Sequence, residues 1–306
     1  MSRLSAVEKY AQPAVVEFWR RLSEQGLQAC EEKMLARYAP PPARVLDLGC
    51  GAGRAGLALT PQGYQVTGID LVWEMVRAAH DLHERAQLAP RLAQADIRAI
   101  PCADARYDAA LIFIAAIQHI TGRSARQRAL AEIARVLRSG GVLILALDNL
   151  APALTCYAWW SWRRLTSAVR RSAPAATPAA GQVRAAAADR MLESRRDGAS
   201  PWVWHARGIA RTLRWRTWNG LIDIGRRARI VPGEIGDTRI NQVSLTPTPG
   251  SVYYHIYRHD ELVEDAAAAG FELTGYHTGR ELDGSQEFAR RVRQLDKQVL
   301  YAFRRP

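Results

Sequence analysis

The chain has 306 residues, a formal net charge of +12 and four cysteines. This length is enough to bury one large core, and one α/β domain carrying an insertion is the expected organisation. The cysteines are widely spaced and the histidines are not clustered, which speaks against a disulfide framework or a zinc site, so we expect no metal. The N-terminus lacks the apolar core of a signal peptide, and we predict a cytoplasmic protein.

Helices and strands are predicted to alternate along the first half of the chain. Residues 1–42 carry apolar side chains at helical spacing, including Val15 and Trp19, and end in a proline run, which predicts an N-terminal helical cap. Strands are expected near 44–49, 65–70, 91–95, 108–115 and 142–148, with helices near 54–60, 72–87 and 123–138. Apolar strands that alternate with helices predict a parallel sheet with helices on both faces, here within a core of residues 43–150.

Residues 151–230 differ in composition from the rest of the chain. They contain 15 arginines, no lysine, four acidic residues and seven of the nine tryptophans. This segment therefore carries +11 of the net charge of +12, and the remainder is nearly neutral. Two basic amphipathic helices, about 155–171 and 203–229, are expected on either side of an Ala/Pro-rich linker. We predict a helical basic insertion over residues 151–250.

After the insertion the chain is expected to return to the core with residues 251–306. Asp260 is expected to cap a helix that runs to Ala269, and Gly270 to end it. Residues 271–278 and 298–304 have the pattern of two further strands.

The most specific motif joins the first strand to the first helix. Gly49, Gly51 and Gly53 stand at alternate positions, where glycine lets the backbone turn tightly and approach a ligand. The helix that follows offers free N–H donors at its start. The stretch from Gly51 also fits the dinucleotide-binding GxGxxG pattern, with Asp70 near the spacing of a ribose-binding acid.

Asp47, two residues before the first glycine, separates two classes of ligand. Its carboxylate would face the pyrophosphate of a dinucleotide at close range, which is unfavourable in a partly desolvated site. A ligand that carries an ammonium and a sulfonium would instead be attracted. S-adenosylmethionine is such a ligand, and it has a ribose for Asp70 but no phosphate. The motif therefore favours S-adenosylmethionine over a nicotinamide or flavin dinucleotide.

With these residues the chain resembles the class I S-adenosylmethionine-dependent methyltransferases. The matching segments, in the order of that family, are Asp47–Gly53, Val66–Asp70, Ala95–Ile97, Tyr107–Asp108, Glu132–Val142 and Tyr253–Leu262. The resemblance implies a three-layer Rossmann-like α/β fold, with a mostly parallel seven-stranded sheet whose last strand is antiparallel. It also implies S-adenosylmethionine as the methyl donor.

The resemblance further implies which residues bind the donor. Asp47 would hold the methionine end, over a floor shaped by Gly49, Cys50, Gly51 and Gly53. The alternative for Asp47 is a strand-end acid bonded to local amides. The remaining cofactor-binding candidates are Asp70 and Leu71 at the ribose, Asp96 and Ile97 at the adenine, and Ile114 after the fourth strand.

The methyl acceptor is expected beyond the end of the fourth strand, at residues 114–119. His119 or Gln118 could orient or deprotonate a nucleophile, since histidine titrates near neutrality. The alternative is a histidine that packs beneath the sheet or bonds a backbone carbonyl. Residues that could cover the site, or simply pack in the core, are Tyr10, Trp19, Tyr254 and His255.

Three interpretations of the insertion stay open. It could be a lid over a small or amphiphilic acceptor, an RNA grip with arginines on phosphates and tryptophans on unpaired bases, or a peripheral anchor on an anionic membrane. Residues 114–121 and 253–257 also resemble the tRNA wobble-uridine carboxyl methyltransferases, which carry paired histidines where this chain has Gln118 and His119. We expect a methyltransferase acting on an O or N atom of a small or amphiphilic acceptor. RNA methylation and a non-catalytic, cofactor-binding regulatory protein are the alternatives.

Overall fold

The computed structural model describes residues 3–114, 116–148, 222, 225–226, 233–243, 246–282 and 298–306. The chain divides into two compact units, Met1–Ala151 with Ile222–Pro306, and Pro152–Leu221. The second unit lies outside the described residues, and so do the basic helix predicted at 155–171 and nearly all of the one predicted at 203–229.

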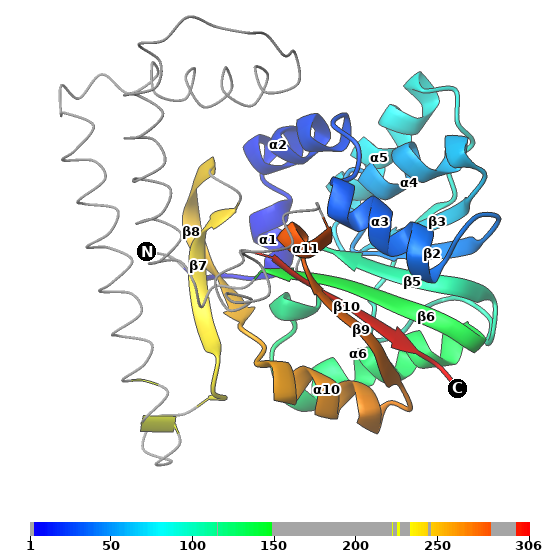
Figure 1. The fold of residues 1–306 in the computed structure, drawn as a ribbon. Coiled ribbons are helices and arrows are strands. Elements are labelled where there is room, and N and C mark those ends of the chain that lie inside the picture. The colour runs from blue at the N-terminus through cyan, green and yellow to red at the C-terminus, as the bar shows by residue number, and fades with distance from the viewer. Residues whose placement is uncertain are drawn as a thin grey trace, which may run out of the picture. The chain divides into compact units, whose positions relative to one another are not determined.

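A seven-stranded sheet forms the centre of the first unit, with the strand order β4-β3-β2-β5-β6-β10-β9 (Figure 1). Neighbours among the first five strands of that order are parallel, whereas β10 runs antiparallel to both β6 and β9. This confirms the predicted sheet with its antiparallel last strand. The strands are β2 (Arg44–Leu48), β3 (Gln65–Asp70), β4 (Leu92–Gln94), β5 (Tyr107–Phe113), β6 (Leu137–Asp148), β9 (Glu272–Thr278) and β10 (Gln298–Arg304).

Helices cover both faces of this sheet, so its strands are apolar on both sides. On one face, side chains such as Ile112 and Leu143 pack against α6 and α10. On the other, side chains such as Leu111 and Ile144 pack against α3 and α4. The helices are α1 (Ala6–Tyr10), α2 (Pro13–Ser23), α3 (Ala29–Tyr38), α4 (Arg54–Leu59), α5 (Trp73–Arg85), α6 (Arg123–Val136), α10 (His259–Ala268) and α11 (Gly279–Leu282).

Most predicted boundaries agree with the structure, and one helix cap does not. β10 covers the predicted residues 298–304. Helix α10 begins at His259 with Arg258 in the N-cap position, so the prediction of Asp260 as its cap is wrong. Asp260 lies in the first turn instead, where a negative charge is favoured by the helix dipole. Gly270 follows the cap residue with a φ of 85°, as expected for a glycine that ends a helix.

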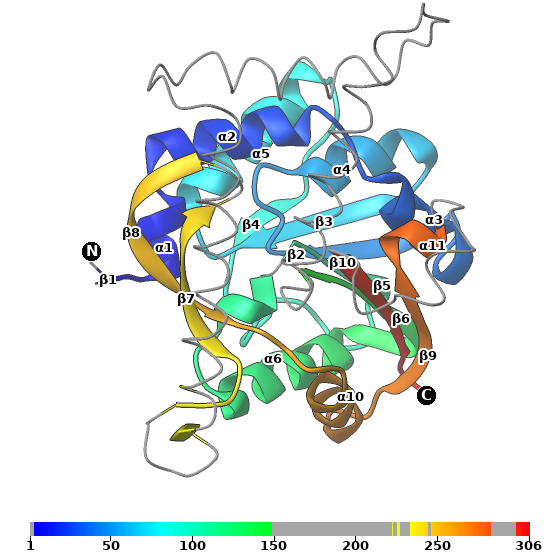
Figure 2. The same cartoon turned by 60° about the vertical axis from the view of Figure 1, so that its left-hand side comes forward.

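A second, three-stranded sheet lies beside the first, with β8 (Thr246–His255) between β1 (Arg3–Leu4) and β7 (Asp237–Val243). Figure 2 shows α1 and β1 against β8, and the buried Lys9 of α1 donates to the Gly250 carbonyl at 3.0 Å. The sequence analysis placed residues 237–250 in a helical insertion and missed this hairpin. Pro247 and Pro249 interrupt the strand pattern, and they are tolerated because β1 pairs only with Ser251 and Val252 further along.

Among the described residues, none of the helices combines the length and the apolar character that crossing a lipid bilayer requires.

Two leucines of the large sheet provide a matched test of the packing. Leu111 in β5 has no exposed surface, whereas Leu273 in β9 is 38% exposed. We expect Leu111→Ala to lower the free energy of unfolding by about 2–5 kcal/mol, because it removes buried methyl groups and leaves a cavity. Leu273→Ala should lower it by less than about 1 kcal/mol. Chemical denaturation of both variants checks this, and equal losses would contradict the burial assigned to β5.

Candidate functional site

The glycine loop lies at the carboxyl end of β2 and leads directly into α4. Gly49, Gly51 and Gly53 have φ values of 74°, 53° and 83°, in the left-handed region that disfavours side chains. A Cβ on Gly49 would lie 2.5 Å from the Cβ of Ala116, so the close approach of the two loops also requires glycine there. At Gly51 the Cβ would meet no protein atom within 4 Å. The loop is therefore closed on the side of Ala116 and open at Gly51.

Asp70, at the carboxyl end of β3, ties this loop to the start of α5. Its carboxylate accepts hydrogen bonds from the Gly51 and Val72 amides, both at 2.9 Å. Burial raises the pKa of Asp70, while these amides act in the opposite direction. The carboxylate is thus oriented by backbone amides on two loops.

Asp47 stands in the middle of the site with 4% of its surface exposed. Burial raises the pKa of Asp47 to about 7, with Arg54 opposing the shift and Asp70 and Glu31 adding to it. Arg54 offsets only part of this shift, because its guanidinium is already paired in a buried, bidentate contact with Glu31 at 2.6 and 2.8 Å. A buried carboxylate with this raised pKa is a site that an added cation would stabilise.

The pKa of Asp96 is shifted in the opposite direction from the pKa values of Asp47 and Asp70. It follows β4 and accepts from the guanidinium of Arg98, whose Nε lies 3.0 Å from both carboxylate oxygens. The Arg98 hydrogen bonds hold the pKa of Asp96 below its usual value. Asp96 is therefore an ionised and already paired acid.

These groups surround one cavity of about 320 Å³ at the carboxyl ends of the parallel strands. Nearly all the predicted cofactor residues line it: Asp47, Gly49, Cys50, Gly51, Asp70, Leu71, Asp96, Ile97 and Ile114. Gly53 lies outside it, where a Cβ would come within 2.7 Å of the His83 ring, so Gly53 serves the contact between α4 and α5.

The strand that leads to the acceptor side ends in a strained turn. Ile114 follows β5 with a φ of 74°, which is unfavourable for a β-branched residue. The chain then forms a single 3₁₀ turn, η2 (Ala116–His119). Such strain persists only where the surrounding structure enforces it, and here it places both Ile114 and His119 at the cavity.

His119 is held at both ring nitrogens. Its Nδ1 lies 2.9 Å from the Tyr253 carbonyl, which can only accept, so the proton is on Nδ1. Its Nε2 lies 2.8 Å from the Tyr10 hydroxyl. Burial lowers the pKa of His119 to about 4, so the ring is neutral at pH 7 and Nε2 accepts. His119 thus bonds a backbone carbonyl, as the alternative expected, and it also lines the cavity.

Gln118 points away from the cavity, in contrast to its tentative catalytic assignment. It is 1% exposed, donates to the His255 carbonyl at 3.0 Å and accepts from the Tyr254 hydroxyl at 2.8 Å. Neither Gln118 nor His255 is among the residues that line the cavity. These contacts hold η2 against β8.

Comparison with known proteins identifies the domain that carries this site. Residues 45–141 match a family model described as a methyltransferase domain. The malonyl-[acyl-carrier protein] O-methyltransferase of Enterobacter lignolyticus is 40% identical over 111 residues, covering 35% of this chain and 41% of that protein. The ubiquinone biosynthesis O-methyltransferase of Xanthomonas campestris pv. campestris is 37% identical over 120 residues, covering 39% of this chain and 48% of that protein.

Residues 45–141 therefore form a methyltransferase domain. The fold agrees: a crystal structure of an S-adenosylmethionine-dependent methyltransferase from Methanosarcina mazei matches with a TM-score of 0.53 and 17% identity, over 89% of this chain and 96% of that one. S-adenosylmethionine is the methyl donor that the sequence motif predicts for this domain. The chain spans less than half the length of the two curated relatives.

The cavity fits that donor by its chemistry. The buried carboxylate of Asp47 suits a ligand with an ammonium and a sulfonium, and Asp70 retains acceptor capacity for ribose hydroxyls. Ile97 and Leu71 offer apolar surface of the kind that an adenine ring packs on. The positions of Asp47 at the methionine end and of Asp70 at the ribose stay predictions for this methyltransferase domain.

Sequence reasoning missed part of the cavity wall. Ser23, Met75 and Thr121 line it from α2, α5 and the loop after η2. They belong to no motif, and a serine or methionine at helical spacing gives no signal of a site. Tyr10 and Trp19, which were weighed between cover and core, both line the cavity.

The raised pKa of Asp47 predicts that donor binding depends on pH. Between pH 5.5 and 7 the affinity for S-adenosylmethionine should rise by up to about tenfold per pH unit, because the ionised carboxylate binds the cation. Asp47→Asn should bind more weakly and lose this part of the pH dependence. Calorimetric titration of both proteins measures it, and parallel pH curves would remove Asp47 from the assignment.

The ligand-free protein provides an independent check of the same group. The folded pKa of Asp47, about 7, is above the unfolded value of 3.8, so the folded state binds more protons between these values. Its contribution to stability is therefore present below pH 4 and lost as the pH rises to 7. At pH 8 we expect Asp47→Asn to be more stable than the parent protein by ~1 kcal/mol or more.

Proposed function

We propose that the protein transfers the methyl group of S-adenosylmethionine to an oxygen atom of a small or amphiphilic acceptor, with His119 as general base. The observation that carries this proposal is that one cavity is lined both by the acids of the glycine loop and by a neutral histidine. The non-catalytic alternative, a protein that only binds the cofactor, has no use for a base held in this way.

The reaction requires alignment and one proton acceptor. The acceptor oxygen attacks the methyl carbon in line with the breaking bond to sulfur, and S-adenosylhomocysteine leaves. A neutral hydroxyl becomes a protonated ether in this step, and that species is strongly acidic. His119 can therefore take the proton at Nε2 even though its pKa is lowered to about 4.

Tyr10 occupies the position that an acceptor hydroxyl would take. Its hydroxyl lies 2.8 Å from Nε2 of His119, and its ring meets the histidine edge-on with centroids 5.2 Å apart. An acceptor hydroxyl could replace this contact and donate to the same lone pair. In this proposal Tyr10 closes the site before the acceptor binds.

The nature of the wall supports an acceptor with apolar parts. The apolar side chains of Trp19, Phe113 and Ile120 line the cavity. Ile120 follows His119 in the sequence, and the Trp19 ring packs against that of Tyr10. The two curated relatives are named as O-methyltransferases, which supports oxygen as the accepting atom. A carboxylate acceptor would need no base, so the held histidine favours a hydroxyl.

An RNA acceptor is the second candidate, favoured by the composition of residues 151–230. Their 15 arginines and seven tryptophans suit contacts to phosphates and unpaired bases. The same composition suits a peripheral membrane contact that would present a lipid acceptor. These residues lie largely outside the described part of the chain, so the acceptor must be found by experiment.

Methyl-tritiated S-adenosylmethionine, incubated with the purified protein and a total cell extract, separates these candidates. We expect the label in the organic-solvent extract, as a small or amphiphilic methyl ether. Label in nuclease-sensitive RNA would replace this proposal by the RNA alternative. Label in neither fraction, with the cofactor still bound, would favour the non-catalytic protein.

His119→Gln tests the base, with the labelled acceptor fraction as substrate. The variant should lose about 10²- to 10⁴-fold in kcat/KM, while its affinity for S-adenosylhomocysteine stays within about twofold. His80→Gln is the matched control, because the His80 side chain is 50% exposed on α5 and outside the cavity. A His119→Gln enzyme as active as the control would exclude the proposed base.

A further inference from the structure

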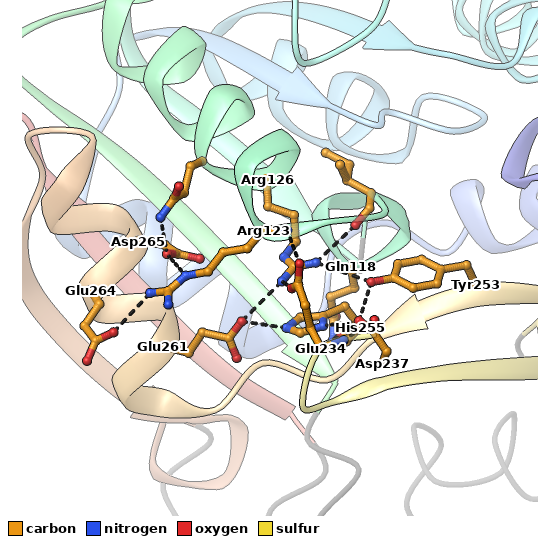
Figure 3. Close-up of polar contacts among 12 residues, drawn as sticks. Gln118, Arg123, Arg126, Glu234, Asp237, Tyr253, His255, Glu261, Glu264 and Asp265 are labelled. Carbon is orange, nitrogen blue, oxygen red and sulfur yellow. Dashed lines mark hydrogen bonds and ion pairs between the residues drawn. The ribbon is translucent and has the colours of Figure 1, made fainter. Parts of the chain in front are cut away.

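A group of charged and polar side chains fills the space between α6, α10 and the hairpin β7–β8, away from the cavity (Figure 3). Arg126 of α6 lies at its centre with no exposed surface. We call this group the Arg126 cluster; its members are Arg126, Glu234, Asp237, Tyr253, His255 and Glu261. Buried charges of this kind are costly unless they are fully paired, so their presence calls for an explanation.

Arg126 joins four separate segments of the chain. Its guanidinium donates to Glu234 before β7, to Glu261 of α10 at 3.2 Å and to the Tyr253 hydroxyl of β8 at 3.3 Å. It also donates to the carbonyl of Ile120, the residue after His119, at 3.4 Å. The Tyr253 hydroxyl in turn donates to Asp237 of β7. The side chain of Tyr253 is thus fixed between a cation and an anion.

His255 adds a second cation to the cluster. Its Nδ1 lies 2.8 Å from Asp237 and its Nε2 lies 2.8 Å from Glu261. Carboxylate oxygens only accept, so both ring nitrogens carry protons and the ring is an imidazolium. Burial works against this charge, but the two carboxylates hold the pKa of His255 above its ordinary value. The Tyr257 ring packs edge-on against it, at 4.9 Å between centroids.

The cluster satisfies its own acceptors. Ligand atoms of Glu234, Asp237 and His255 lie within 4.8 Å of one another, a spacing that a metal ion could use. However, the Asp237 oxygens accept from Tyr253, from His255 and from the Glu234 amide, and the Glu234 oxygens accept from Arg126 and from the Arg123 amide. These carboxylate acceptors are therefore already engaged within the network, while Nε of the buried Arg126 has no hydrogen-bond partner among the described residues.

The turn η2, which carries Gln118 and His119, is hydrogen-bonded to the same strand β8. The carbonyl of Tyr253 accepts from Nδ1 of His119, and the carbonyl of His255 accepts from Gln118. The Tyr254 hydroxyl donates to the same Gln118. Each of these three consecutive residues thus bonds to η2, and two of them also place their side chains in the Arg126 cluster.

We propose that Arg126 and Tyr253 are positioning residues for His119. The cluster holds the Tyr253 side chain, and the carbonyl of the same residue then keeps the proton of His119 on Nδ1. This leaves Nε2 as an acceptor that faces the cavity. The inference rests on the proposed role of His119 as the base, but it concerns a property of the histidine ring that can be measured without any acceptor.

Two acids of the Arg126 cluster lie on the C-terminal side of the insertion. Glu234 and Asp237 follow the segment Pro152–Leu221, which forms the second compact unit, after 12 intervening residues, 222–233. The Arg126 cluster is complete only when the chain has returned from that unit and formed β7. The base is therefore oriented by the residues that close the insertion, although none of them lines the cavity.

Histidine-selective ¹³C/¹⁵N labelling of the full chain, saturated with S-adenosylhomocysteine, tests the proposal by NMR. The His119 signal is assigned from the spectrum of His119→Gln. At pH 7 the parent protein should show neutral His119 in the Nδ1–H form alone. Tyr253→Phe, which keeps the ring and removes the hydroxyl, should show a measurable fraction of the Nε2–H form, and Arg126→Met a larger one.

Arg123→Met is the matched control on the same helix. The Arg123 guanidinium binds Asp265 and Glu264 of α10, which are not members of the Arg126 cluster, so its loss should lower the melting temperature without changing the His119 tautomer. All variants should bind S-adenosylhomocysteine within about twofold of the parent. If Arg126→Met does not fold, Tyr253→Phe decides.

Folded Tyr253→Phe with His119 still wholly in the Nδ1–H form would overturn the proposal, as would the same tautomer change in the Arg123→Met control. Failure of the proposed function is a separate outcome, seen in the methyl-transfer experiments and not in these spectra.

Discussion

The reversal of strand order at β2 is the constraint on which the rest of the structure depends. β3 lies on one side of β2 and β5 on the other, so the loops that leave these neighbouring strands diverge. A crevice must open there at the carboxyl ends of the strands. The glycine loop, Asp70, Asp96 and η2 all follow strands of this parallel group, and this is why residues far apart in the chain line one cavity.

The acids of the protein show how partners, and not burial alone, decide the chemistry. Asp108 is partly buried, yet hydrogen bonds from Arg44 and Arg138 outweigh burial and hold its pKa at about 2. Asp47 is more deeply buried, and Arg54, whose charge lowers its pKa, is bound to Glu31. Its pKa therefore rises to about 7. The negative charge of Asp47 is therefore only partly compensated, at the position where the cationic methionine end of S-adenosylmethionine is expected.

The acceptor side is assembled from three distant parts of the sequence. Tyr10 comes from the first helix, His119 from the turn after β5, and Tyr253 from β8. The small sheet makes this possible, because β1 and α1 pack on β8 and thereby bring the N-terminal segment to the cavity. A sheet outside the large core thus completes the site, and the Arg126 cluster fixes it to α6 and α10.

Regular periodicity and the glycine motif were enough to predict the large sheet, the order of its elements and most of the cofactor cavity. Local sequence determines these features, because strand and helix patterns repeat over short distances and three closely spaced glycines specify one turn. Sequence patterns predict both Gln118 and His119 as catalytic candidates, because neighbouring positions in a chain do not reveal which side of η2 each side chain occupies. Sequence reasoning also missed the hairpin β7–β8, whose prolines obscure the alternation.

The sequence by itself determined the fold class, and it predicted the donor and the acids that line the cavity. Only the tertiary structure decided that His119 faces the cavity while Gln118 bonds to β8, and that Arg126 lies buried among carboxylates instead of on a solvated helix face. The physical reason is that these choices depend on contacts between residues more than 100 positions apart, such as Tyr10 with His119 and Arg126 with Glu234. No local pattern in the chain encodes such pairings.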